Sequence, residues 1–410
     1  MRSSTTDWAA DFDILDPRYI LDPASIWSQL RGTCPIAQTE RYGRTWMPVS
    51  YDDLAKIAHD VERFSSRDIA VITPNRELNP LQPMMLEAPP ITSDPPVHTW
   101  ARRLLLPAFG PSAIEAVTPV TRGLANELID AVIADGHADA ATDYAQHIPV
   151  RVIAQMLGIP PDDEAIFTGW AVTILQEGFT NIDKATGAVM ELITYFSERS
   201  AERRAVPADE RPDDLLTLLI EAEVDGDPLT DRHIIGSCFL LLLAGIDTTW
   251  SAIGSSIWHL ATHPQDQARL RAEPELMTTA VEEFLRYYSP VTMARYVTED
   301  TEFSGCPMRM GDKVLMTFPA GNRDPAMFER ADEFVIDRTR NRHFAFGSGI
   351  HRCLGSNLAR MELRVAIEEW LRRVPTFELA DIEANDVAWT GGQVRGPRCL
   401  PVRWDAAAVC

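Results

Sequence analysis

The residues most suited to chemistry lie in the loop HFAFGSGIHRCLG, residues 343–355, where Cys353 stands near the end of a glycine-punctuated stretch. The next residues, SNLARMELRVAIEEWLRR, show helical apolar periodicity, so Cys353 is expected just before a helix N-terminus. The free backbone N–H groups and the helix dipole at such a position favour a thiolate. A cysteine placed there can be a buried structural residue, a nucleophile or a metal ligand.

The surroundings of Cys353 distinguish among these three roles. A nucleophile needs a base, and the spacing of two residues does not by itself aim the imidazole of His351 at the sulfur. No G-x-S-x-G motif supports a hydrolase. Gly349 and Gly355 permit tight turns and the close approach of something flat and bulky. We therefore favour a single thiolate ligand to a haem iron, which pushes electron density toward bound dioxygen and favours O–O cleavage.

A second chemical feature interrupts a long apolar helix. Residues 229–263 contain no proline, and a helix of that length spans roughly 45–50 Å. Its centre reads FLLLLAGIDTTWSAIG, where Gly, Asp and Thr together cost the helix about 2–3 kcal/mol relative to alanine. Thr248 either bonds back to the Ala244 carbonyl and bends the helix, or it lines a groove that holds a small molecule and water. In the second case Thr248 donates a hydrogen bond and Asp247 relays protons.

Composition excludes several classes of function. The 410-residue chain has a formal net charge of −22, which disfavours nucleic acid and anionic lipid as partners. The N-terminus lacks the apolar core of a signal peptide, and the apolar run 234–246 falls short of the roughly 20 residues that span a bilayer. The six cysteines contain no C-x-x-C, so neither disulfides nor zinc are expected. We expect a cytoplasmic protein with no membrane contact.

The elements that must position these residues are mostly helices. Strand-like patterns are few, and neither an internal repeat nor a linker divides the chain. We predict a mainly α fold in one domain, residues 1–410, with a small β-rich lobe mostly within 38–70 and 294–320. The proline-rich segment 71–96, which has seven prolines and no glycine, is predicted to be a loop that contacts substrate.

Taken together, the motifs resemble those of soluble bacterial cytochromes P450. The F-x-x-G-x-x-x-C-x-G pattern begins at Phe346 and ends at Gly355, A-G-x-D-T-T covers residues 244–249, and E-x-x-R stands at Glu283 and Arg286. The similarity extends from about residue 13 to 405 and includes D-P-P-x-H and N-R-D-P. It implies the fold of that family, with one long central helix, and a haem-thiolate monooxygenase that uses O2 as co-substrate.

The resemblance also implies roles for single residues. Cys353 would be the axial ligand of haem b, and Asp247 and Thr248 would be catalytic. The third partner of the structural Glu283/Arg286 pair stays open, because A-D-E-F at 331–334 stands where many relatives have P-E-R-F. The other residues implied to contact haem are His98, Arg102, Arg295 and His351 at the propionates, and Phe346, Gly347, Gly355 and Ala244.

The substrate is expected to be neutral or weakly polar, since no charged residue is among those implied to line the pocket. The segments NRHFAFGSGIHRCLG and GGQVRG are similar to those of members that act on small terpenoids or aromatics. Oxygen insertion into a C–H bond of a small to medium hydrophobic substrate is therefore the expected reaction. The residues implied to line the pocket are Met84, Met85, Leu240, Leu243, Ala244, Val291, Met293 and Val394.

Electrons must come from another protein, because the chain carries no flavin or nicotinamide motif. Residues 338–360 contain five arginines and no acids, and such a basic stretch on an acidic protein favours docking of an acidic partner. An iron–sulfur ferredoxin with its NAD(P)H-dependent reductase is expected, with Arg352 meeting the donor and His351 the haem. Two alternatives stay open: a haem-thiolate sensor or carrier without turnover, which would not need the acid–alcohol pair, and a peroxide-driven peroxygenase, which often lacks it.

Overall fold

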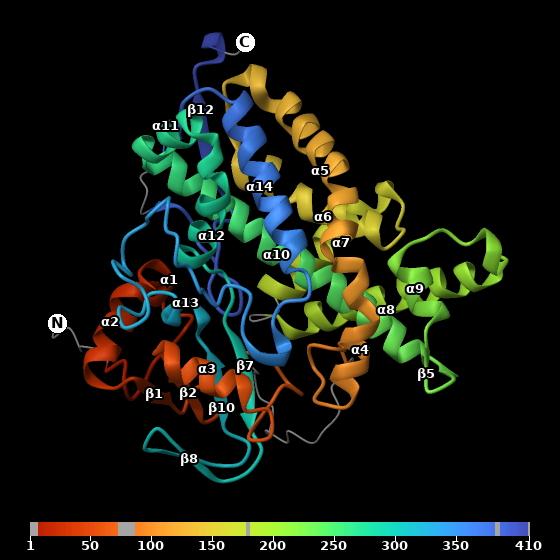
Figure 1. Ribbon diagram of the computed structural model, residues 1–410, viewed down its shortest axis with the longest axis vertical. Helices are drawn as coiled ribbons and strands as arrows, with labels where there is room; N and C mark the ends of the chain where they lie inside the picture. The colour runs from red at the N-terminus through yellow and green to blue at the C-terminus, as the bar shows by residue number, and fades with distance from the viewer. Residues whose placement is uncertain (1–6, 73–86, 178–180, 382–385, 409–410) are drawn as a thin grey trace.

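The computed structural model describes residues 7–72, 87–177, 181–381 and 386–408. Helices form most of the molecule, and the strands of the largest sheet gather with the N-terminal helices at one corner (Figure 1). The predicted fold class, mainly α with small sheets, is confirmed. Met84 and Met85, predicted to contact substrate, lie outside the described residues.

The long helix predicted from residues 229–263 is α10, Asp231–Thr262. The Thr230 side chain caps its first turn by accepting from the His233 N–H, and Pro264 opens the next helix. Within the described residues α10 is the one helix long and apolar enough to cross a membrane, yet 72% of its most apolar window is buried inside the protein. It is thus a core helix, and its Gly, Asp and Thr are held by packing against its neighbours.

The other helices surround α10. Its closest neighbours are α6, α14, α7 and α8, so the centre of the long helix is enclosed from several directions. Short π-helical segments lie before α6, at Ala140–Ala145, and between α7 and α8, at Thr173–Glu177. The bounds are α1 Pro17–Leu21, α2 Pro23–Thr33, α3 Tyr51–His59, α4 Val97–Leu105, α5 Pro111–Val132, α6 His147–Met156, α7 Glu164–Val172, α8 Ile182–Ala205, α9 Leu215–Glu221, α11 Pro264–Ala272, α12 Met277–Tyr287, α13 Phe318–Gly321 and α14 Ser356–Arg373.

The largest sheet has five strands in the order β1-β2-β10-β7-β3. Only the β2/β10 pair is parallel; the other three pairs are antiparallel. A three-stranded sheet, β11-β12-β4, and the two hairpins β5-β6 and β8-β9 complete the described strands. Their bounds are β1 Ile36–Thr39, β2 Thr45–Pro48, β3 Phe64–Ser65, β4 His137–Asp139, β5 Glu223–Val224, β6 Asp227–Pro228, β7 Met293–Val297, β8 Thr301–Phe303, β9 Cys306–Met308, β10 Lys313–Met316, β11 Phe377–Leu379 and β12 Pro401–Trp404.

Buried apolar residues form one large cluster among the helices and two smaller ones around the five-stranded sheet. The large cluster contains both the leucine-rich half of α10 and the buried face of α14. Because α10 and α14 pack on each other, the D-T-T centre of the first lies near the helix that follows Cys353. The fold therefore brings the two motifs to one region of the molecule.

Candidate active site

The cysteine loop is closed by its own backbone. The Cys353 N–H donates to the Phe346 carbonyl at 2.7 Å, and the Gly355 N–H donates to the cysteine sulfur. α14 begins at Ser356, so the expected position of Cys353 just before a helix is confirmed. Gly349 has a φ of +70°, and a Cβ there would collide with the Ala58 carbonyl at the end of α3. The loop thus keeps a fixed shape that presents the sulfur.

Burial and charge act in opposite directions on the Cys353 thiol. Desolvation is the largest effect and raises its pKa, while the Gly355 N–H and the positive charges of Arg102, Arg352 and Arg360 lower it. The net shift is upward, so burial outweighs the groups that favour a thiolate. The side chain is nevertheless exposed and is not packed in the apolar core. A metal cation at the sulfur would deprotonate it outright.

Four basic side chains from separate segments converge beside this loop. His98 and Arg102 lie one turn apart on α4, Arg295 lies on β7, and His351 precedes the cysteine. The two imidazole rings are 4.3 Å apart between centroids. Burial, and after it the positive charges nearby, lowers the pKa of His351 to about 2, and burial lowers the pKa of Arg295 to about 10. His351 is therefore neutral at pH 7, and the guanidinium groups of Arg102 and Arg295 are the cations that call for an anion.

The polar atoms of this basic cluster (His98, Arg102, Arg295 and His351) are not fully satisfied by the protein. The Nε2 atoms of His98 and His351 are buried and have no hydrogen-bond partner among the described residues. Burial lowers the pKa of His98, and the nearby Asp94 opposes this shift only in part; the Asp94 carboxylate already accepts from the Ser65 hydroxyl and the Ser66 N–H. Two further carboxylates, such as the propionates of haem, would supply the missing acceptors.

One stripe of α10 is open while the rest of its centre is buried. Leu240, Ala244 and Thr248 follow one another at four-residue spacing; Ala244 is exposed and the other two are half-buried. The Thr248 hydroxyl donates to the Ala244 carbonyl at 2.8 Å, so the hydrogen bond predicted as one of the two alternatives is present. The Thr248 side chain is still half-buried rather than fully buried, so this hydrogen bond does not exclude contact with a bound molecule. Leu243, also predicted to line the pocket, is buried among the residues of the large apolar cluster.

Asp247 points away from this open stripe into a buried ion pair. Its side chain is 2% exposed, and its Oδ1 atom lies 2.7 Å from Nη2 of Arg398, whose guanidinium stacks over the Trp250 ring at 4.4 Å. Arg398 was not predicted from the sequence as the partner of Asp247, although a buried acid in an apolar helix indicates that a cation must be near. The acid and the alcohol of the D-T pair thus face different surroundings.

Three residues predicted to contact substrate come together on two extended segments. Val291 and Val394 face each other in an antiparallel bridge, and the side-chain amide of Gln393 donates to the Met293 sulfur at 3.4 Å. The Thr292 N–H donates to the Gln393 carbonyl at 3.0 Å. These contacts join residues about 100 positions apart into one wall.

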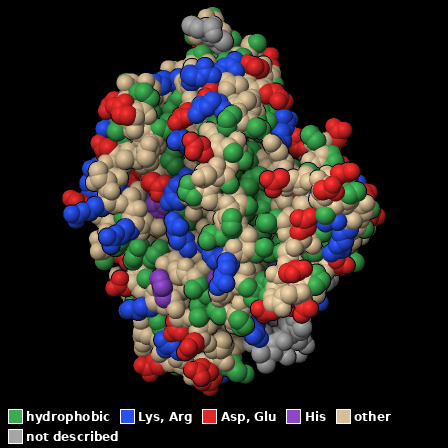
Figure 2. Space-filling view, turned by 45° about the vertical axis from the view of Figure 1, so that its right-hand side comes forward, with side chains coloured by type: hydrophobic (Ala, Val, Ile, Leu, Met, Phe, Trp, Pro, Cys, Tyr) green, Lys and Arg blue, Asp and Glu red, His purple; other side chains and the backbone are tan. Residues whose placement is uncertain are grey.

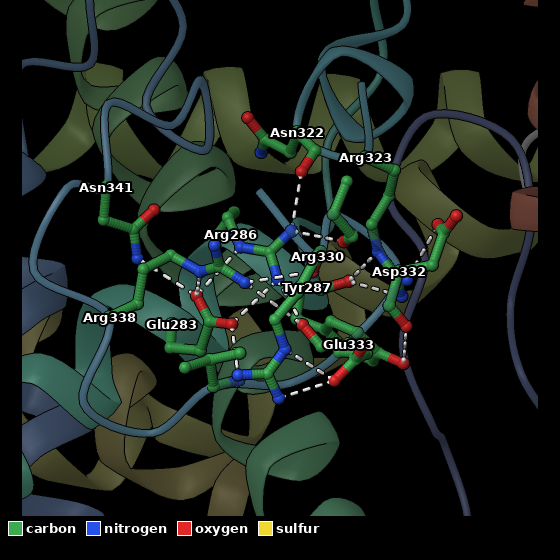
Figure 3. A network of polar contacts seen from close by, with 12 residues as sticks. Glu283, Arg286, Tyr287, Asn322, Arg323, Arg330, Asp332, Glu333, Arg338 and Asn341 are labelled. Carbon is green, nitrogen blue, oxygen red and sulfur yellow. Dashed lines mark hydrogen bonds and ion pairs between the residues drawn. The ribbon is translucent and has the colours of Figure 1, made fainter. Parts of the chain in front are cut away.

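The E-x-x-R pair is fully buried and forms the centre of the network shown in Figure 3. Arg286 donates to Glu283 through both Nε and Nη2 at 2.8 Å, and Arg338 donates to the same carboxylate at 3.0 Å. Arg338 is therefore the third partner that the sequence left open. Arg286 also donates to the carbonyls of Asn322, Ala331 and Glu333, which anchors the segment leading to the cysteine loop.

These contacts divide the basic stretch 338–360 into structural and exposed arginines. Arg338 pairs with Glu283, and Arg360 pairs with Glu282 and stacks over the Phe346 ring at 4.3 Å. The remaining three, Arg340, Arg342 and Arg352, are exposed. Figure 2 shows Lys and Arg side chains along the middle of one face, with acidic side chains more frequent toward its right-hand side.

Comparison with known proteins identifies the family. The model of the family described as "Cytochrome P450" matches residues 172–387. The chain is 33% identical to mycinamicin IV hydroxylase/epoxidase of Micromonospora griseorubida over 93% of this chain and 95% of that protein. The chain belongs to the cytochrome P450 family. It is similarly 33% identical to the P450 monooxygenase PikC of Streptomyces venezuelae, over 96% of this chain and 94% of PikC.

The solved structures agree with this assignment. The P450 PksS of Bacillus subtilis superposes with a TM-score of 0.86 at 32% identity, covering 96% of this chain and all of that one. The predicted family and enzyme class, a P450 monooxygenase, are thus confirmed. The family binds haem through a cysteine thiolate and uses O2, and the accessible Cys353 sulfur beside the basic cluster fits that group.

Proposed function

We propose that this P450 inserts one oxygen atom of O2 into a C–H bond of an uncharged, small to medium hydrophobic substrate. The observation that carries the proposal is the basic cluster beside Cys353, where two buried imidazole nitrogens have no partner among the described residues. Cys353 would hold the haem iron, and the basic cluster would bind the two propionates. Bound there, haem supplies the activation of dioxygen that C–H oxidation requires.

The contacts of the haem ring would come from the loop and from α10. Phe346 is buried under Arg360, Gly347 has a φ of +65°, and the Gly355 N–H bonds the sulfur. Ala244 is exposed on the open stripe of α10, where its small side chain leaves room for a planar group. These four residues would contact the haem ring.

Proton delivery would be shared by Thr248 and Asp247. The Thr248 hydroxyl lies on the open stripe, where it can hold a water molecule or donate a hydrogen bond. Asp247 lies on the buried side of the helix and is held by Arg398, so it must leave that pair before it can pass a proton. The two residues therefore act in sequence, with Asp247 supplying protons from the protein interior and Thr248 placing them.

The substrate site would be lined by Leu240, Ala244, Val291, Met293 and Val394, which carry no charge. Such a wall binds by burial of apolar surface and rejects ions. Small terpenoids and aromatics fit these limits, and the names of two relatives add uncharged compounds related to mycinamicin and to polyketides to the candidates. Screening neutral compounds for displacement of water from the haem iron tests the class.

The electron donor would be an iron–sulfur ferredoxin with its NAD(P)H-dependent reductase, in the cytoplasm. Support comes from the exposed Arg340, Arg342 and Arg352 on a chain whose net charge is −22. Arg352→Glu is expected to raise the ferredoxin concentration needed for half-maximal reduction several-fold, with a weaker dependence on salt. An unchanged value would remove Arg352 from the docking surface.

The decisive experiment uses carbon monoxide. The reduced protein should give the red-shifted Soret band of thiolate-ligated haem, and Cys353→Ala should abolish that band; a band retained by the variant overturns the ligand assignment. Cys399→Ala changes an exposed thiol elsewhere and is the matched control. Product formed from O2 with ferredoxin and reductase excludes the sensor, and product formed only with peroxide identifies the peroxygenase.

A further inference from the structure

A cavity of about 830 Å³ lies away from the cysteine loop. It is lined by α1 and α2, the end of α10, the end of α12 and residues 389–395, and it is open to solvent. α1, α2 and α12 lie on one side of the molecule (Figure 1). None of the residues implied to contact haem or substrate lines it. A cavity of this size accommodates a small organic molecule.

This cavity lies behind the wall predicted to contact substrate. Pro290 and Thr292 line it, whereas Val291 between them pairs with Val394. Arg395, the next residue after Val394, lines it as well. Because neighbouring side chains on extended segments point to opposite faces, the two segments separate the cavity from the substrate side.

The cavity wall is aromatic and rigid. The Trp258 ring meets the rings of Tyr288 and Trp389 edge to face, with centroids 5.9 and 5.3 Å apart. The Tyr288 hydroxyl is fixed 2.6 Å from Nδ1 of the buried His259. Such walls favour a planar apolar ligand. The aromatic lining residues are Tyr19, Trp27, Trp258, Tyr287, Tyr288 and Trp389.

Arg395 provides the cavity with a cation. Its guanidinium stacks over the Trp389 ring at 4.2 Å and donates to the backbone carbonyls of Ile20 and Leu21 at 2.9 and 3.3 Å. Among the described residues no carboxylate forms an ion pair with it. Burial lowers its pKa to about 10, which still leaves it positively charged at neutral pH. A half-buried cation held by carbonyls and a ring, without a carboxylate in an ion pair, favours an anionic ligand.

A second guanidinium strengthens this preference. Arg323 lies over the Tyr287 ring at 3.4 Å, and its Nη1 atom is 3.5 Å from Asp332, a long ion pair with an exposed carboxylate. Asp22 and Asp332 also line the cavity and would repel a ligand with several negative charges. A single negative charge therefore fits better than a phosphate.

We infer that this cavity is an accessory binding site for a planar aromatic carboxylate, distinct from the haem and substrate site. The aromatic rings would enclose the apolar part of the ligand, and Arg395 would bind its carboxylate. The inference stands on the cavity, its rings and its two guanidinium groups, and does not depend on the substrate of the enzyme.

The test is calorimetric titration of 2-naphthoate into the haem-loaded protein saturated with 4-phenylimidazole, which closes the haem site. Wild type should bind one equivalent, and neutral 2-naphthalenemethanol should bind at least ten-fold more weakly. Ser28→Trp fills the cavity from an exposed position on α2 and should abolish binding. Thr33→Trp, an exposed position on the same helix outside the cavity, is the matched control and should bind normally.

Arg395→Gln should remove the preference for naphthoate over the alcohol. Absence of saturable naphthoate binding to wild type at millimolar concentration would overturn the inference. Equal binding by wild type and Ser28→Trp would overturn it as well, because the probe would then occupy another place. Should Arg395→Gln fail to fold, the Ser28 and Thr33 variants still decide the question, since both change exposed side chains.

Discussion

Nη2 of Arg398 lies 2.7 Å from Oδ1 of Asp247, so a residue near the C-terminus holds the acid at the centre of α10. The segment that carries Arg398 is pressed against the same helix, because a Cβ at Gly396 would lie 2.5 Å from the Ser251 hydroxyl. Burial of both side chains makes the pair sensitive to loss of either partner. The position of the proposed proton relay is thus set by the last part of the chain.

Replacing Arg398 by Leu is expected to lower the free energy of unfolding by about 3–5 kcal/mol, because a buried carboxylate loses its cation. The double variant Asp247→Leu/Arg398→Leu should lose less than the sum of the two single variants. Urea denaturation of the four proteins measures this coupling. Strict additivity would show that the pair contributes no net interaction.

Replacing Thr248 by Ala should leave haem bound while the product formed per NAD(P)H falls several-fold, because the hydroxyl on the open stripe is lost. Thr248→Ser keeps a hydroxyl at the same place and is the matched control. Product and NAD(P)H consumption are measured together. Wild-type coupling in Thr248→Ala would remove Thr248 from proton delivery.

Glu362 on α14 makes stability depend on pH. Burial raises its pKa to about 8, opposed by a hydrogen bond with Thr249. Between the usual carboxyl pKa and pH 8 the folded protein holds a proton that the unfolded chain has lost, so stability is greatest at low pH and falls as pH rises. The contribution of this group falls by up to about 1.4 kcal/mol per pH unit in that window.

The neutral variant Glu362→Gln removes this dependence. Its melting temperature relative to wild type should increase steadily from pH 5 to pH 8 and then level off. Glu378→Gln, a change at a carboxyl group that is largely exposed in its pair with Arg403, is the control. If the melting temperatures of wild type and Glu362→Gln changed with pH by the same amount, the predicted dependence of stability on the Glu362 carboxyl would be contradicted.

Much of this arrangement could be predicted from the sequence because it rests on local patterns. The proline-free segment and its cap define α10, and the periodicity after Cys353 defines α14. Arg338 and Arg398 could not be assigned, because their partners Glu283 and Asp247 are 55 and 151 positions away and only the fold brings them together. The upward pKa shift of Cys353 was missed for the same reason, since desolvation depends on all surrounding segments.

The basic cluster leads to a last prediction, on haem retention. Removal of both imidazoles in His98→Leu/His351→Leu should speed haem transfer to apomyoglobin several-fold, because two proposed partners of the propionates are lost. His137→Leu changes an exposed histidine on β4 and should transfer haem at the wild-type rate. The carbon monoxide band should stay at the thiolate position in the double variant, since Cys353 is intact. An unchanged transfer rate would show that these two histidines, though unsatisfied and close together, do not hold the cofactor.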